Sequence, residues 1–246
     1  MITRKERERY ERQIMLADFG EAGQEKLKQA RVLIVGVGGL GCPLALYLAA
    51  AGVGAITLVD YDQVEWSNLN RQILHWEDNV GDDKVRSAAE KIRRLNSATD
   101  VRELGVSLSA ENASEIVSRH DLILDALDDL HVRQILNRAA VQARIPMIYG
   151  GIHGMNGMTT WILPGRTPCL KCLFPERLDN EKFPVLGTTP GIVAMIQATE
   201  AVKYLVGMGN LLAGRLLVYD GLAMTFSEIE VLRDPNCVVC GGIEPA

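Results

Sequence analysis

Short apolar runs alternate with helix-forming segments through the first half of the chain. Residues 31–36, 55–60 and 122–127 are rich in β-branched and other apolar residues, with no regular polar alternation. Such runs are typical of strands covered on both faces of a parallel sheet. The apolar segment 40–51, ended by Gly52, predicts a helix between the first two runs. The pattern therefore predicts a βαβ unit that starts at residue 31.

The alternation continues to about residue 150. We expect further helices at residues 1–15, 22–29, 84–95, 110–119 and 132–143, and further strands at 101–108 and 146–149. Strands that alternate with helices favour an α/β fold with a doubly wound, mostly parallel sheet of the Rossmann-like kind.

The pattern changes in the second half. Residues 158–163 alternate between apolar and polar positions, as an antiparallel strand does, and 216–219 and 225–232 are two more candidate strands. We therefore expect an antiparallel C-terminal extension of the sheet. No internal repeat or low-complexity linker interrupts the sequence, so we expect a single domain over 1–246, with a helical arm at 1–30 and halves at 31–150 and 151–246.

A loop and a helix lie between these antiparallel strands. Residues 173–187 are rich in proline and charge and are expected to form a loop. The apolar segment 190–206 predicts a helix with Thr189 as its N-cap and Pro190 at its first position.

Composition narrows the class of protein. The net charge of −5 argues against general binding to nucleic acid or an anionic membrane. No apolar run is long enough to span a bilayer, and the charged start at residues 1–9 lacks the apolar core of a signal peptide. We therefore expect a cytoplasmic protein. Disulfides are rare in that compartment, so the five cysteines need another explanation.

A glycine-rich turn follows the first predicted strand. It has the form GxGxxG, and its glycines are Gly36, Gly38, Gly39 and Gly41. Such a turn lets phosphate approach backbone N–H groups at a helix N-terminus. Asp60 ends the next strand, where it can accept hydrogen bonds from a ribose. This context favours nucleotide binding over a tight packing turn, although it fits NAD as well as ATP.

Polar and charged residues follow Asp60 closely. They include Asp62, Asn68, Arg71 and Gln72, and Lys84 begins the next helix. A nucleoside triphosphate needs such donors, because planar guanidinium groups bind phosphate in a bidentate manner. Taken singly, the arginine is more often a surface ion-pair partner, the asparagine a helix cap and the lysine a solvated side chain. Together they favour phosphate binding.

Asp128 follows the strand that ends at residue 127. Doubly wound sheets bind ligands at the carboxyl ends of their strands, and a carboxylate there is suited to Mg²⁺ that bridges phosphates. The competing interpretation is that Asp128 or Asp129 caps the following helix.

Four of the five cysteines form two CxxC pairs. These are Cys169 with Cys172, and Cys237 with Cys240. Two such pairs supply four thiolates for a closed, structural Zn²⁺ site, which is favoured over two redox-active or inert pairs. Cys42 stands alone and is interpreted as a small buried residue. The four histidines, at positions 75, 120, 131 and 153, show no ligand or triad spacing.

The combination of these motifs resembles the bacterial adenylyltransferases of molybdopterin and thiamine biosynthesis, which are relatives of the ubiquitin-activating enzymes. The matching stretches are residues 9–14, 36–41, 60–72, 81–84 and 124–129 and both CxxC pairs, which cover nearly the whole chain. The resemblance implies ATP-dependent adenylation of the C-terminal carboxylate of a small ubiquitin-like sulfur-carrier protein that ends in Gly-Gly, with release of pyrophosphate. It makes 31–150 the nucleotide-binding half and 151–246 the carrier-binding half.

The resemblance also assigns roles to residues. It implies a homodimer in which Arg12 enters the partner's ATP site. Asn68, Arg71, Gln72 and Lys84 are expected to contact phosphates, and Gly39 and Asp60 to contact the nucleotide backbone and ribose. Asp128 is expected to be the catalytic acid that binds Mg²⁺. These roles come from the resemblance, not from spacing. Residues 173–187 are expected to be the crossover loop that covers the carrier's tail.

The chain departs from the family pattern at three points. Leu127-Asp128-Asp129 stands where many members have Thr-Asp-Asn, residues 173–189 contain no cysteine, and no rhodanese domain follows residue 246. The second point argues against a covalent carrier intermediate, and the third implies that a separate protein donates sulfur.

Three other functions remain open at the level of sequence. The first is adenylation of a peptide or small-molecule carboxylate. The second is an NAD-dependent dehydrogenase, for which the phosphate-binding set and the zinc site have no use. The third is a scaffold that binds ATP without turnover, which the complete charged set disfavours.

Overall fold

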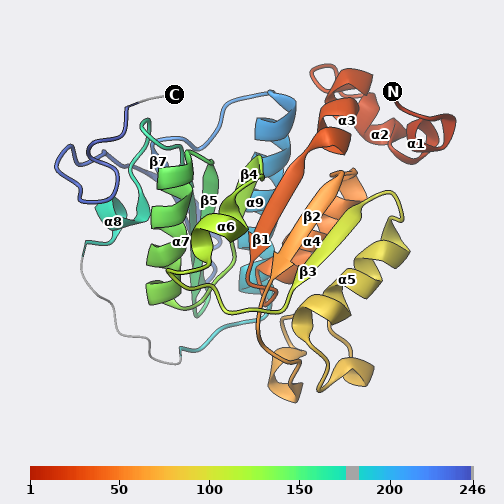
Figure 1. The fold of residues 1–246 in the computed structure, drawn as a ribbon, viewed down its shortest axis with the longest axis horizontal. Helices are drawn as coiled ribbons and strands as arrows, with labels where there is room; N and C mark the ends of the chain where they lie inside the picture. Colours follow the sequence, from red (N-terminus) through yellow and green to blue (C-terminus); the bar gives the residue numbers. More distant parts are fainter. Residues whose placement is uncertain (176–182, 245–246) are drawn as a thin grey trace.

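The structure is a computed structural model that describes residues 1–175 and 183–244. Its centre is an eight-stranded sheet in the order β3-β2-β1-β4-β5-β6-β7-β8, with helices on both faces (Figure 1). The strands are β1 (Arg31–Val35), β2 (Ala55–Val59), β3 (Asp100–Leu104), β4 (Leu122–Asp125), β5 (Met147–His153), β6 (Asn156–Ile162), β7 (Arg215–Asp220) and β8 (Thr225–Glu230). The predicted α/β class is confirmed.

Strands β1 to β5 are parallel, and their spatial order reverses between β1 and β4. β1 pairs with β2 on one side and with β4 on the other, so Val35 has both Val59 and Asp125 as neighbours in register. This reversal defines the point where doubly wound sheets bind ligands, at the carboxyl ends of the strands. Strands β6, β7 and β8 are each antiparallel to the preceding strand. The predicted antiparallel extension is therefore confirmed.

The helices form a layer on each face of the sheet. They are α1 (Arg4–Arg9), α2 (Glu11–Ile14), α3 (Gly20–Gln29), α4 (Gly41–Ala51), α5 (Lys84–Leu95), α6 (Ala113–Val117), α7 (Leu130–Ala143), α8 (Leu170–Leu173) and α9 (Thr188–Val206), with 3-10 turns η1 (Trp66–Asn68) and η2 (Glu77–Asn79). Apolar residues of α4, α5 and α9 share one core with the sheet, and those of α6 and α7 share another on the opposite face.

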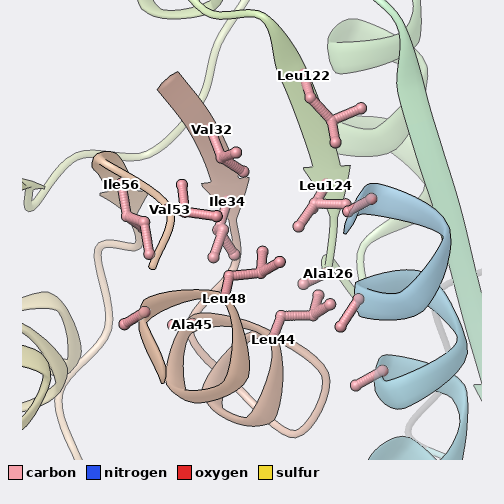
Figure 2. Packing of buried hydrophobic residues seen from close by; sticks show 14 of the residues in the cluster. Val32, Ile34, Leu44, Ala45, Leu48, Val53, Ile56, Leu122, Leu124 and Ala126 are labelled. Carbon is pink, nitrogen blue, oxygen red and sulfur yellow. The ribbon is translucent and has the colours of Figure 1, made fainter. Parts of the chain in front are cut away.

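The first core shows why the strand pattern was continuous. Ile34 of β1 lies over Leu44 and Leu48 of α4, and Leu124 of β4 turns toward the same layer beside α9 (Figure 2). All four side chains are fully buried. Burial of each contributes about 1.5–3 kcal/mol relative to exposure. Residues of the opposite parity, such as Leu33, belong to the other core, so both faces of β1 require apolar side chains.

The N-terminal arm packs at the amino end of the parallel strands, away from the segment that follows β2 (Figure 1). The single helix predicted for residues 1–15 is wrong in one respect, because it breaks into α1 and α2 at Tyr10. Tyr10 is buried, and its hydroxyl accepts a hydrogen bond from Asn96 Nδ2 at 2.8 Å. That long-range contact explains the break, which local pattern does not indicate.

The last helix also starts earlier than predicted. Helix α9 begins at Thr188 with Gly187 as its N-cap, so Thr189 is not the cap and Pro190 is the third residue rather than the first. The hydroxyl of Thr189 instead donates to the carbonyl of Gly154 at 3.2 Å. Proline is tolerated here because backbone N–H groups in the first turn have no partner within the helix. In the described part of the chain, none of the helices combines the length and the apolar character that a membrane span requires.

Candidate functional site

The glycine-rich turn lies on the carboxyl ends of β1 and β4. Gly36 has a φ of +95°, and a Cβ there would lie 2.5 Å from the carbonyl oxygen of Ala126. A Cβ on Gly41 would lie 1.9 Å from the carbonyl oxygen of Gly36. Only glycine fits at these two positions, so the turn can lie directly over the strand ends. The turn leads into the N-terminus of α4, where the positive end of the helix dipole favours an anion.

Asp60 holds this turn against the end of β2. Its Oδ2 accepts the N–H of Val37 at 2.7 Å, and its Oδ1 accepts the N–H of Asp62 at 2.9 Å. Burial raises the pKa of Asp60, and the positive charge of Lys84 opposes the rise. A carboxylate offers about four acceptor sites, so Asp60 keeps capacity for a ribose hydroxyl while it fixes the turn.

Lys84 brings a buried positive charge to the same edge of the sheet. Only 6% of the residue is exposed, and its Nζ lies 2.7 Å from Oδ2 of Asp62. Asp62 is itself nearly half exposed at its side chain. The ammonium is therefore held at the surface of the site by one carboxylate, and it still has N–H donors for a phosphate.

The segment after β2 provides the amide and guanidinium groups. Gln72 is 5% exposed, and its Oε1 has no hydrogen-bond partner within the described residues. Arg71 donates from Nη1 to the carbonyl of Ser67 at 2.8 Å. A Cβ on Gly39 would lie 3.7 Å from Cγ of Arg71 and 3.1 Å from Cγ of Pro190. The glycine turn, Arg71 and the start of α9 therefore meet at one place.

Asn68 has a local structural role in addition to its predicted one. Its Oδ1 accepts the N–H of Glu65 at 3.1 Å, which caps the 3-10 turn η1. Asn68 thus completes the capping box of η1, whose N-cap is Glu65, and contact with phosphate stays a prediction.

Asp128 stands exposed at the end of β4. Asp129, not Asp128, caps α7, because its Oδ1 accepts the N–H of Val132 at 2.9 Å. No hydrogen bond or ion pair involves the Asp128 carboxylate within residues 1–175 and 183–244. Asp62, then burial, and then Asp128 raise the pKa of the exposed Tyr61. The carboxylate therefore lies near the end of β2, as the predicted site requires.

Three buried residues behind Asp128 are absent from the sequence prediction. Asp125 is fully buried, and Oδ1 lies 3.4 Å from Nε of Arg133. Burial raises the pKa of Asp125 to about 6, against the lowering effect of Arg133. Gln197 of α9 donates from Nε2 to the carbonyl of Asp125 at 3.1 Å. A lone aspartate in an apolar strand and an arginine in a helix carry no spacing signal, so sequence alone does not pair them.

Arg12 is the one predicted site residue that the fold places elsewhere within the chain. It is exposed on α2, and the neighbouring Gln13 donates to the carbonyl of Ala51 at 3.0 Å. Ala51 ends α4, whose first residue is at the glycine turn. Eleven helical residues span about 16 Å, so Arg12 lies at the far end of α4 from the site.

The four cysteines of the CxxC pairs converge. Their sulfur atoms all lie within 4.8 Å of one another, with 3.7 Å between Cys169 and Cys237 and 3.4 Å between Cys172 and Cys240. A tetrahedral Zn–S₄ centre has sulfur atoms about 3.8 Å apart. Burial raises the pKa of Cys169 and Cys172, whereas at Cys237 the backbone N–H groups of Cys240 and Val239 outweigh burial and lower the pKa to about 7. The set is suited to a soft metal held by thiolates.

The remaining cysteine and one histidine belong to the core, as expected. His75 Nε2 donates to the carbonyl of Val37 at 2.9 Å, and Nδ1 lies 3.0 Å from Oγ of Ser87. Burial lowers the pKa of His75 to about 4, so the ring is neutral at neutral pH. Cys42 is fully buried, and burial raises the pKa of its thiol to about 12. Neither group is prepared for catalysis at neutral pH.

The assembled edge of the sheet therefore combines backbone donors, a guanidinium, an ammonium, a buried amide and one exposed carboxylate. These groups suit a nucleoside polyphosphate together with a divalent cation. Cys42 Sγ lies 3.6 Å from Nε2 of His75, but both groups are buried and burial raises the pKa of the thiol, so this pair is not an activated nucleophile at neutral pH.

Comparisons with known proteins agree with this architecture. A model of the ThiF family matches residues 10–239. The sulfur carrier protein adenylyltransferase of Thermus thermophilus is 41% identical, over 97% of this chain and 92% of that protein. The adenylyltransferase and sulfurtransferase MOCS3 of Drosophila persimilis is 42% identical, over 97% of this chain and 54% of that protein, so the chain spans about half of that relative's length. The crystal structure of E. coli MccB with AMPCPP and MccA has a TM-score of 0.86 and 26% identity, over 95% of this chain and 74% of that one.

Proposed function

Since this chain belongs to the ThiF family, we propose that it adenylates the C-terminal glycine carboxylate of a small ubiquitin-like sulfur-carrier protein. The observation that carries the proposal is the meeting of the glycine turn, Arg71, Lys84 and Asp128 at the carboxyl edge of the sheet. The relative from Thermus thermophilus, which this chain matches nearly from end to end, is named for the same activity. Family membership removes the support for a dehydrogenase.

The chemistry needs positioned charge rather than a base. An oxygen of the carrier's carboxylate bonds to the α-phosphorus of ATP, the bond from that phosphorus to the bridging oxygen breaks, and pyrophosphate leaves. The carboxylate has a pKa of roughly 3.3–3.7, so it is already ionised. The barrier is repulsion between anions and the cost of alignment, which Arg71, Lys84 and the N-terminus of α4 reduce by binding phosphate oxygens.

A divalent cation fits beside this set. Asp128 is an exposed carboxylate at a strand end, near Tyr61 and the carboxylates that follow β2. Bound Mg²⁺ would neutralise phosphate charge, as it does in other phosphoryl-group enzymes. Asp128 would hold it, and Asp60 would hold the ribose. For the cysteine cluster we propose a structural Zn²⁺, because four sulfur ligands leave no open position for chemistry.

The acceptor side of the site lies in the second half of the chain. Residues 176–182 of the proposed crossover loop lie outside the described residues. At its described end, Gly154 donates to the carbonyl of Pro184 at 2.8 Å, and Leu186 donates to the carbonyl of Gly154 at 3.0 Å. The loop thus returns to the turn between β5 and β6 before α9 begins. We propose that it covers the carrier's tail, without a covalent intermediate.

The position of Arg12 supports a homodimer. Arg12 lies at the far end of α4 from its own site, and we propose that it serves the site of a neighbouring copy instead. Co-expression of Arg12→Ala with Asp128→Asn is therefore expected to restore activity that each variant lacks. In a random mixture about a quarter of sites would be intact, since half the dimers are mixed and each has one complete site. Differently tagged copies allow the mixed dimer to be purified and assayed for exchange. A mixed dimer no more active than the two parents would show that Arg12 does not act across an interface.

The proposed activity is tested by ATP–pyrophosphate exchange with Mg²⁺, with and without a panel of carriers that end in Gly-Gly. We expect exchange that requires one carrier and disappears when its final glycine is deleted. Truncation is the matched control, because it leaves the folded body of the carrier unchanged. Exchange supported by a peptide or small carboxylate, but by none of the carriers, would redirect the assignment to that acceptor. Tight ATP binding without exchange would identify a non-catalytic binder.

A further inference from the structure

A buried ion pair contacts the short connection between β4 and α7. Asp125 is the last residue of β4, and Arg133 lies in the first turns of α7 with only 5% of its surface exposed. Their side chains form the buried ion pair described above. Such a pair usually stabilises a fold no better than apolar residues of similar size. Its presence at the edge of the site therefore calls for a role other than stability.

The pair fixes the peptide group immediately before Asp128. Oδ1 of Asp125 accepts the N–H of Leu127 at 3.1 Å. Nη2 of Arg133 donates to the carbonyl of Leu127 and, at 2.6 Å, to the carbonyl of Gly150 on β5. The carbonyl of Leu127 belongs to the peptide bond that carries the N–H of Asp128. One guanidinium thus links that peptide to the neighbouring strand.

Other contacts fix the same connection from its remaining sides. The N–H of Ala126 donates to the carbonyl of Val35 at 2.9 Å, and Gln197 binds the carbonyl of Asp125. On the other side of Asp128, the cap formed by Asp129 fixes the start of α7. Asp128 therefore has an exposed side chain on a backbone that is held on both sides.

We propose that Arg133, supported by Asp125, is a positioning residue that holds the Asp128 carboxylate where it binds the divalent cation of the ATP complex. The inference rests on the proposed function for the identity of the nucleotide complex, and it adds the group that orients the cation ligand. Removal of a group that hydrogen-bonds to a metal ligand and orients it typically lowers metal affinity or activity by about 10- to 100-fold. Nη2 reaches both carbonyls while Nε faces Asp125, and a rigid planar guanidinium holds these contacts in one geometry better than the flexible side chain of lysine does.

Cation binding tests the proposal without relying on turnover. The protein is titrated with Mn²⁺ in the presence of AMPCPP, and free Mn²⁺ is measured by electron paramagnetic resonance. The Asp125→Asn/Arg133→Met double variant removes both buried charges together, and the introduced amide keeps an acceptor for the N–H of Leu127. We expect Mn²⁺ to bind about tenfold more weakly, while AMPCPP without metal binds as in the wild type. Arg138→Met is the matched control, because Arg138 is exposed on the same helix, and it should bind Mn²⁺ normally.

A conservative variant separates positioning from folding. Arg133→Lys keeps the charge and should lose part of the Mn²⁺ affinity, with a lower maximal exchange rate and a nearly unchanged KM for ATP. Extra Mg²⁺ should recover part of that rate. Unchanged Mn²⁺ affinity in either folded variant would overturn the proposal, as would equal loss of metal-free AMPCPP binding. If none of the carriers supports pyrophosphate exchange by the wild type, the proposed function fails. The comparison of Mn²⁺ affinities still decides the role of Arg133 in that case.

Discussion

Substitution of Asp128 by asparagine is expected to reduce carrier-dependent pyrophosphate exchange by about a hundredfold or more. The side chain is exposed at the end of β4, and the capping role that offered an alternative belongs to Asp129. Asparagine has nearly the same shape, so the change removes charge with little effect on packing. The loss should lie mainly in the maximal rate and in the Mg²⁺ requirement, because the glycine turn and Asp60 still bind the nucleoside.

Steady-state exchange over a range of ATP and Mg²⁺ concentrations measures this effect. Asp100→Asn is the matched control, since Asp100 is an exposed carboxylate at the amino end of β3, on the opposite edge of the same sheet. It should keep the wild-type rate. If Asp128→Asn exchanged pyrophosphate as fast as this control, the assignment of Asp128 as the cation ligand would be wrong.

The parallel half of the sheet was predictable because its physical requirements are local. A strand buried on both faces must be apolar at every position, as residues 32–35 are, and a turn pressed onto a neighbouring carbonyl must be glycine, as at Gly36. The two CxxC pairs were predictable as one site because four thiolates at that spacing have few other uses. In these cases a single stretch of sequence, or a pair of short ones, carries the whole signal.

The break in the N-terminal helix and the buried ion pair at the site could not be predicted, because they depend on tertiary contacts. The break at Tyr10 follows from a hydrogen bond to Asn96, 86 positions away. Asp125 and Arg133 are close in the sequence, but neither residue has an unusual local pattern, and Arg133 also donates to the carbonyl of Gly150 on β5. Such positions are visible only once the fold has brought them together.

The site contains two kinds of residue, those expected to contact the nucleotide and those that orient the contacting groups. Groups that are expected to touch the nucleotide, such as Arg71 and Lys84, gather in one stretch after β2, where the sequence shows them. Groups that only orient them, such as Asp125, Arg133 and Gln197, lie on different elements behind the strand ends. Helix α7 also joins this region to the cysteine cluster, since Asn137 accepts the N–H of Leu170 at 3.0 Å.

That connection makes the cysteine cluster important for the stability of the second half. Substitution of Cys240 by serine is expected to abolish stoichiometric zinc binding and to lower the melting temperature by roughly 10 °C, the shift that about 3–4 kcal/mol produces in a chain of this size. Three of the four sulfur-bearing residues are buried within the core that α7 shares with the sheet. In this variant no bonds to a metal offset the cost of holding three thiols and a hydroxyl close together there.

Zinc content by atomic absorption and thermal unfolding by circular dichroism measure the two effects. Cys42→Ala is the control, because Cys42 is buried in the other core and should leave one zinc per chain in place. Arg233 lies beside the second CxxC pair and donates to the carbonyls of Gly165, Gly241 and Ile243, so part of the segment should stay attached without metal. Loss of the metal in Cys240→Ser should therefore loosen the C-terminal segment before the rest of the chain unfolds. We expect early cleavage by protease after residue 231. If Cys240→Ser kept both its zinc and its melting temperature, the cluster would not be a structural metal site.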